Sequence, residues 1–214
     1  METKMFATFP ELLRDLQVFN QWLGKQGPLP GKMETICRKV MNAMFLVEEA
    51  QKYPHATTAD IMAGMHEMRA MDAYIDSTLG QLHGAVDVMA ALITLKLHGF
   101  DKRPYSFIQL FDKSGVIRKD ILQPQFTDGQ VLLLEGIYQE LSAWIMEYND
   151  SKHNKMPDRM IIPSDYPVGL FEISQGLVPY YATAKDAHSE LTEVRNLLSS
   201  AGSKICSFVA QVSW

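Results

Sequence analysis

The sequence feature that most constrains the fold is an apolar segment near the middle of the chain, residues 78–99, TLGQLHGAVDVMAALITLKLHG. Apolar residues recur through it at helical spacing, and after Val86 they cover nearly the whole circumference of the predicted helix. A helix that is apolar on all sides has to be enclosed by other elements. We therefore expect a central, buried helix that ends at Gly99. Gly80 and Gly84 on it are spaced to admit another backbone at close range.

Most of the remaining chain also carries apolar residues at the spacing of one helix face, and prolines, glycines and capping residues divide it into segments. The sequence predicts a break at Ser77–Thr78, a capping box formed by Thr127 and Gln130, and another break at Gly202. The predicted helices cover about 10–24, 32–53, 57–76, 77–99, 104–113, 127–148, 167–177, 179–199 and 203–214. The fold class is therefore all-α, a bundle of about 7–9 helices.

Length, composition and charge bound the kind of protein. The chain has 214 residues, of which 47% are hydrophobic and 21% charged, enough for one large or two small domains. We expect a helical core at 1–119 with a C-terminal helical extension, 120–214, packed on it, unless the whole chain is a single domain. The net charge of −5 and the lack of a long Lys or Arg run disfavour nucleic-acid binding. Two cysteines, Cys37 and Cys206, give no disulfide framework or zinc spacing, so we expect buried thiols.

The N-terminal residues METKMFATFPELLRDL lack a basic region followed by an apolar one, so we expect no signal peptide. No uninterrupted apolar stretch approaches about 18 residues, so we expect no membrane partner. The expected location is the cytoplasm, or the host cytoplasm if the protein is viral. Methionines recur every three residues at Met62, Met65, Met68 and Met71, which indicates a core or subunit-contact face or, alternatively, a groove for varied hydrophobic partners. We expect a homo-oligomer.

Acidic residues are the strongest candidates for chemistry, because the chain has no nucleophile elbow, phosphate-binding glycine loop, HExxH or CxxC motif. Glu48 and Glu49 end one apolar run, and Asp87 lies inside the most apolar helix. A carboxylate there is costly unless it is paired or holds a metal. His83 precedes Asp87 by one helical turn and could share a cation with it. The structural alternatives are a solvated Glu pair, an Asp satisfied by a buried cation, and a hydrogen-bonding His.

Four segments of the chain occur in an order that is also found in a known protein family. They are LQVFNQWLGKQGPLPG, MNAMFLVEEAQKY, HGAVDVMAALITLKLHGFD and FIQLFDKSG. This order resembles the MazG-type all-helical nucleoside triphosphate pyrophosphohydrolases, a superfamily that includes the dimeric dUTPases, from Leu16 to about Lys119. The resemblance implies Mg²⁺-dependent cleavage between the α- and β-phosphates of a nucleotide. By resemblance, Glu48 or Glu49 and Asp87 are the expected metal ligands. The corresponding enzyme hypothesis has Glu48, Glu49 and Asp87 holding the metal, His83 as a catalytic residue that orients a ligand or water, and Lys96, Lys102, Arg103 and Lys113 as phosphate contacts.

Two positions depart from that family's acid pattern. Lys52 stands one turn after the Glu pair, and His83 stands four residues before the Asp, where the family has acids. A Lys there repels a cation. Three hypotheses stay open: a divergent nucleotide pyrophosphohydrolase, a non-catalytic helical assembly or accessory protein such as a viral structural protein, and a regulator that binds a nucleotide or partner helix without hydrolysis.

Overall fold

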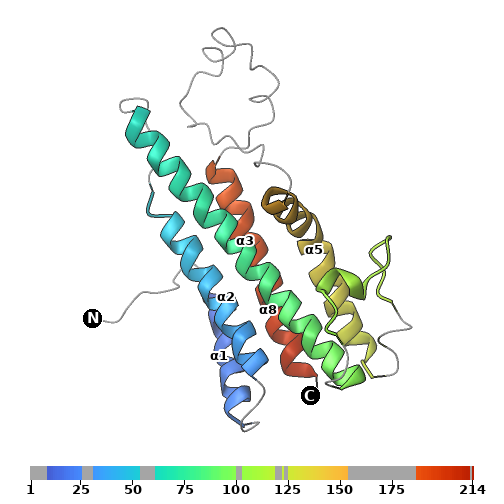
Figure 1. The fold of residues 1–214 in the computed structure, drawn as a ribbon. Coiled ribbons are helices and arrows are strands. Elements are labelled where there is room, and N and C mark those ends of the chain that lie inside the picture. Colours follow the sequence, from blue (N-terminus) through green and yellow to red (C-terminus); the bar gives the residue numbers. More distant parts are fainter. Residues whose placement is uncertain are drawn as a thin grey trace.

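A computed structural model describes residues 9–25, 31–53, 61–99, 103–118, 122, 125–153, 187–212 and 214. The regular elements within these ranges are all helical, which confirms the all-α class: α1 (Pro10–Lys25), α2 (Gly31–Ala50), α3 (Ile61–His98), the 3₁₀ helix η1 (Phe107–Leu110), α5 (Asp128–His153) and α8 (Ala187–Gln211). In Figure 1, α1 and α2 lie on one side and α5 on the other, with α3 and α8 between them. The predicted helix at 167–177 falls outside the described ranges, so the finer helix count stays a prediction.

The central apolar segment belongs to α3, a single helix of 38 residues, and the predicted break at Ser77–Thr78 is wrong. Thr78 is fully buried, and its hydroxyl donates to the Tyr74 carbonyl at 2.8 Å, one turn back along the same helix. A hydroxyl can satisfy itself in this way inside a helix as well as at a cap. The expected burial is confirmed: the buried residues after Gly84 are Ala85, Val86, Met89, Ala90, Ala91, Leu92, Ile93 and Thr94.

The last helix is also continuous, and the predicted break at Gly202 is wrong. α8 runs from Ala187 to Gln211 through Gly202, which is buried. A Cβ built at Gly202 would lie 3.0 Å from both Leu12 methyl carbons, so this glycine serves close packing of α8 on α1. α8 contacts α1, α2, α3 and α5, so it joins the two sides of the bundle together with α3, which contacts both α2 and α5.

The beginning of α5 has the capping box that the sequence predicts. The Thr127 amide donates to Gln130 Oε1 at 2.9 Å, and the Gln130 amide donates to Thr127 Oγ1 at 3.3 Å. The Gln130 side-chain amide also donates to the Gln211 carbonyl at 2.9 Å. The same residue therefore caps one helix and fixes it against the last residue of α8.

One hydrophobic cluster contains residues from Phe9 to Val212, including residues of α8 and of the three N-terminal helices. The core is thus shared across the proposed boundary between 119 and 120, and that division stays a prediction. Cys37 and Cys206 are buried, as expected, and form no disulfide, and burial raises the pKa of the Cys206 thiol.

The Met stripe begins on the first turns of α3, and of its side chains the structure describes that of Met71, which is 3% exposed and belongs to the core. The Ala70–His98 part of α3 is long and apolar enough to cross a membrane by length and composition. Within the bundle, 56% of the most apolar 18-residue stretch of this part is buried. The core helix of a helical bundle can have the same length and apolar composition as a membrane-spanning helix. The absence of a membrane partner therefore stays a prediction.

Candidate functional site

The Asp87 carboxylate lies where α3 meets the segment that follows it. Its Oδ1 accepts a hydrogen bond from the Phe107 amide at 2.9 Å, and its Oδ2 lies 3.3 Å from His83 Nε2. Phe107 is the first residue of η1, so the carboxylate occupies the amide end of that short helix. The His83 ring makes an edge contact with Tyr148 of α5, with ring centroids 5.9 Å apart. Both carboxylate oxygens therefore have contacts within the chain.

A second polar residue of α3 holds the same segment. Thr94 Oγ1 accepts from the Tyr105 amide at 3.0 Å and donates to the Ala90 carbonyl at 2.8 Å. Thr94 follows Asp87 by seven residues, or about two helical turns, so the two share a face of α3. Together they fix the backbone of residues 105–107 along the helix. Sequence reasoning missed this role, and an Asp and a Thr seven apart on an apolar helix were the available signal.

The Phe107 side chain, whose backbone amide is held by Asp87, packs in the core of the bundle. Phe107 is fully buried, and its ring lies edge-on to Phe111 at 5.2 Å between centroids. Phe111 stacks on Tyr138 of α5 at 4.1 Å. The segment predicted as a helix at 104–113 thus forms a single 3₁₀ turn, because its two aromatic rings pack between α3 and α5.

The turn after Phe111 is organised by another carboxylate. Asp112 Oδ1 accepts from Ser114 Oγ at 2.7 Å, the Ser114 amide at 2.8 Å and the Val116 amide at 3.0 Å. The Ser114 hydroxyl first, and then the amides, hold the pKa of Asp112 below its ordinary value. A backbone bridge between Phe111 and Ile117 closes the turn. These hydrogen bonds give the Asp112 carboxylate a local structural role in forming the turn.

The two predicted groups of metal ligands lie at different levels of the bundle. Glu49 forms an ion pair with Lys52 and lies close enough to Tyr74 of α3 for its charge to act on the pKa of that phenol. The pKa of Tyr74 is raised by its hydrogen bond with Tyr53 and, to a lesser degree, by the Glu49 charge. Tyr74 precedes Asp87 by thirteen residues, which is about 20 Å along a helix axis. The structure therefore brings His83 and Asp87 together and leaves Glu49 well away from them.

At the level of Asp87, helix α2 contributes a cation. A Cβ built at Gly84 would come 2.5 Å from Lys39 Nζ, so the Lys39 side chain lies over this glycine. Gly80 likewise faces the Tyr148 hydroxyl, at 2.8 Å from a built Cβ. The two glycines make room for side chains rather than for a backbone. Among the residues described, no group of three or more His, Cys, Asp or Glu is placed to hold a metal.

The predicted phosphate contacts are spread along the chain. Lys96 lies in the last turn of α3, about 14 Å along the axis from Asp87. Arg103 and Lys113 are exposed on either side of η1. Lys102 lies outside the described residues. Their role as phosphate contacts stays a prediction.

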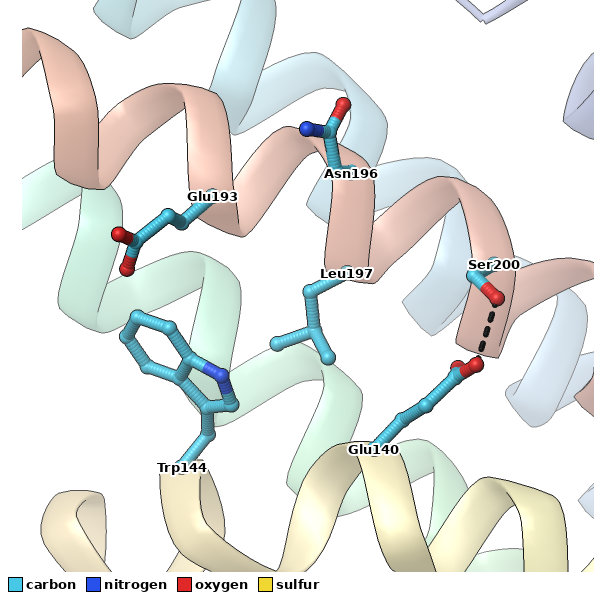
Figure 2. A pocket seen from close by; sticks show the side chains of 6 residues that line it. All are labelled: Glu140, Trp144, Glu193, Asn196, Leu197 and Ser200. Carbon is cyan, nitrogen blue, oxygen red and sulfur yellow. Dashed lines mark hydrogen bonds between the residues drawn. The ribbon is translucent and has the colours of Figure 1, made fainter.

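A pocket of about 400 Å³ lies between α5 and α8, and Asp87 is not among its lining residues (Figure 2). Glu140 Oε1 accepts from Ser200 Oγ at 2.7 Å and pairs with Lys204, whereas its Oε2 is buried without a hydrogen-bond partner. The lining residues are Glu140, Trp144, Glu193, Asn196, Leu197 and Ser200. An indole beside carboxylates is chemically suited to a cationic group. Neither Trp144 nor the acids beside it belong to a motif that the sequence alone would mark as a site.

Comparison with protein-family models, with curated proteins and with solved structures finds no match to this chain. The pyrophosphohydrolase resemblance therefore stays a hypothesis, to be weighed on the contacts of the residues that carry it.

Proposed function

We propose that the protein is a non-catalytic helical assembly or accessory protein. The observation that carries this proposal is the use of both Asp87 oxygens within the chain, one by the Phe107 amide and one by His83. A carboxylate that anchors a connecting segment serves the fold. Lys39 of α2 lies over Gly84, three residues before Asp87 on α3, and its positive charge opposes the binding of a divalent metal in this region.

The outer faces of two helices support the same proposal. Met41 and Phe45 on α2 are 36% and 46% exposed, and Leu132 and Met146 on α5 are 65% and 55% exposed. Large apolar side chains that lie outside a well-packed core are available for subunit contacts. A homo-oligomer is therefore the expected form of the protein.

The second candidate is a divergent Mg²⁺-dependent nucleoside triphosphate pyrophosphohydrolase. The observation in its favour is that the Asp87 side chain, next to His83, remains 40% exposed and can be reached from solvent. Mg²⁺ is bound in proteins through a few carboxylate oxygens and water. In this candidate Asp87 holds the metal and His83 orients a water, and Glu49 lies at the level of Tyr74, about 20 Å from Asp87 along α3.

Two measurements on the purified chain test the proposal. We expect no Mg²⁺- or Mn²⁺-dependent pyrophosphate release from a panel of nucleoside triphosphates, together with a mass by size-exclusion chromatography and light scattering above that of a monomer. Pyrophosphate release that is lost in Asp87→Asn would overturn the proposal in favour of the enzyme. A monomer at about 100 μM would also contradict it, because stable assemblies generally bind more tightly than this.

A further inference from the structure

One outward stripe of α2 carries charges and apolar residues in an ordered arrangement. Glu34, Arg38, Met41, Phe45 and Glu48 follow at steps of four, three, four and three residues, which places them on one helix face. The first four are exposed and Glu48 is half-buried. Lys52 continues the stripe in the turn after α2. Six positions therefore form a continuous surface, which we name the α2 stripe.

The α2 stripe lies off the buried face of its helix. The residues that pack inward are Met33, Ile36, Cys37, Val40, Ala43, Met44, Val47 and Ala50. Arg38 and Glu48 make no ion pair within the part of the chain that the structure describes. The stripe thus combines an apolar centre with charged ends outside the core.

The order of residues is symmetric in chemistry about the middle of the helix. If a second α2 lies antiparallel on the first, with the two-fold axis level with Ala43, then Met41 faces Phe45 of the copy. The next pair outward is Arg38 with Glu48, and the outermost is Glu34 with Lys52. Every pair is either apolar with apolar or acid with base, and each occurs twice because of the symmetry. A parallel arrangement would instead place each charged residue beside the same residue of the copy, so that like charges would repel.

We infer that the α2 stripe is the contact surface of a two-fold symmetric homodimer in which two α2 helices pack antiparallel. The occupant is a second copy of this chain, because the charge order of the stripe is complementary to itself. From Glu34 to Lys52 the contact extends about 27 Å, enough for several helical turns of side-chain packing. The inference rests on the proposed assembly function and names the surface that carries it.

Charge reversal at one pair tests the inference. Arg38→Glu places an acid against Glu48 of the copy twice, and Glu48→Arg places a base against Arg38 twice. Each variant alone should raise the dimer dissociation constant at least about tenfold, measured by sedimentation velocity over a concentration series. An equimolar mixture of the two variants should restore a one-to-one dimer, because both of its cross-chain pairs are then of opposite charge.

Matched controls separate this contact from general effects. Lys32→Glu makes the same charge change as Arg38→Glu at an exposed position of α2 outside the stripe, and should leave the dissociation constant within about twofold. Leu132→Ser removes an exposed apolar side chain from α5 and should also have little effect. Circular dichroism melting verifies that each variant retains the fold.

The possible outcomes have distinct meanings. Weaker dimerisation of each single variant, together with recovery of the dimer in the equimolar mixture, supports the inference. Single variants that self-associate as tightly as wild type overturn it while leaving assembly through another surface intact. Failure of the mixture to recover overturns the antiparallel register. A wild-type chain that is monomeric at about 100 μM contradicts both the inference and the proposed function.

Discussion

At the scale of single residues, the polar groups inside the apolar α3 are explained by what they hold. Asp87 and Thr94 accept hydrogen bonds from the backbone amides of Phe107 and Tyr105, and the Thr78 hydroxyl donates to a carbonyl of its own helix. A buried or half-buried polar atom is tolerated where it replaces a lost hydrogen bond to water. The residue that most suggested a metal site from sequence is thus a structural anchor in this geometry.

Substitution of Asp87 should separate anchoring from charge. Asp87→Ala leaves the Phe107 amide without its acceptor and should lower the free energy of unfolding by about 1–3 kcal/mol. Asp87→Asn keeps an acceptor oxygen in place and should cost less. Urea unfolding measures the two losses, and amide hydrogen exchange at Phe107 should accelerate in the alanine variant more than in the asparagine variant. Equal effects of both variants would show that the charge, and not the hydrogen bond, matters.

At the scale of elements, two glycines within helices have different roles that only packing reveals. Gly202 of α8 faces the fully buried Leu12, and a Cβ there would lie 3.0 Å from its methyl carbons. Gly136 of α5 faces the Lys204 side chain, and a Cβ there would lie 3.5 Å away, an ordinary contact. A flexible lysine can move aside, whereas a leucine enclosed by the core cannot.

The same substitution should therefore have opposite effects at the two positions. Gly136→Ala should raise the free energy of unfolding by about 0.5–1 kcal/mol, because alanine restricts the unfolded chain and favours the helix. Gly202→Ala should lower it by about 1–3 kcal/mol through overpacking against Leu12. Chemical denaturation of the two single variants measures both changes. Stabilisation by Gly202→Ala would mean that α1 shifts easily away from α8.

At the scale of the whole molecule, α8 unites the bundle. It contacts each of the other four long helices, and the start of α5 is hydrogen-bonded to its last residue. Phe208 lies fully buried on it, stacked with Phe126 at 6.0 Å and edge-on to Trp214 at 6.3 Å between centroids. Damage to α8 should consequently affect the entire core rather than one part of it.

Truncation of Phe208 tests this cooperativity. Phe208→Ala should lower the free energy of unfolding by about 3–5 kcal/mol, with a single transition seen by both far- and near-ultraviolet circular dichroism. The matched variant Leu132→Ala, on the exposed face of α5, should change it by no more than about 0.5 kcal/mol. Two separate transitions in the Phe208 variant would instead support independent units on either side of residue 119.

The sequence by itself determined the helical class, the burial of the segment around Val86 and the capping box at Thr127, because apolar periodicity and short-range capping are local properties. Only the tertiary structure decided that α3 and α8 run through their apparent breaks. It also decided that Lys39 and Tyr148 lie over the two glycines, and that Glu49 and Asp87 lie at separate levels. These facts depend on how one helix registers against another, and helix register is set by side-chain packing between segments far apart in the chain.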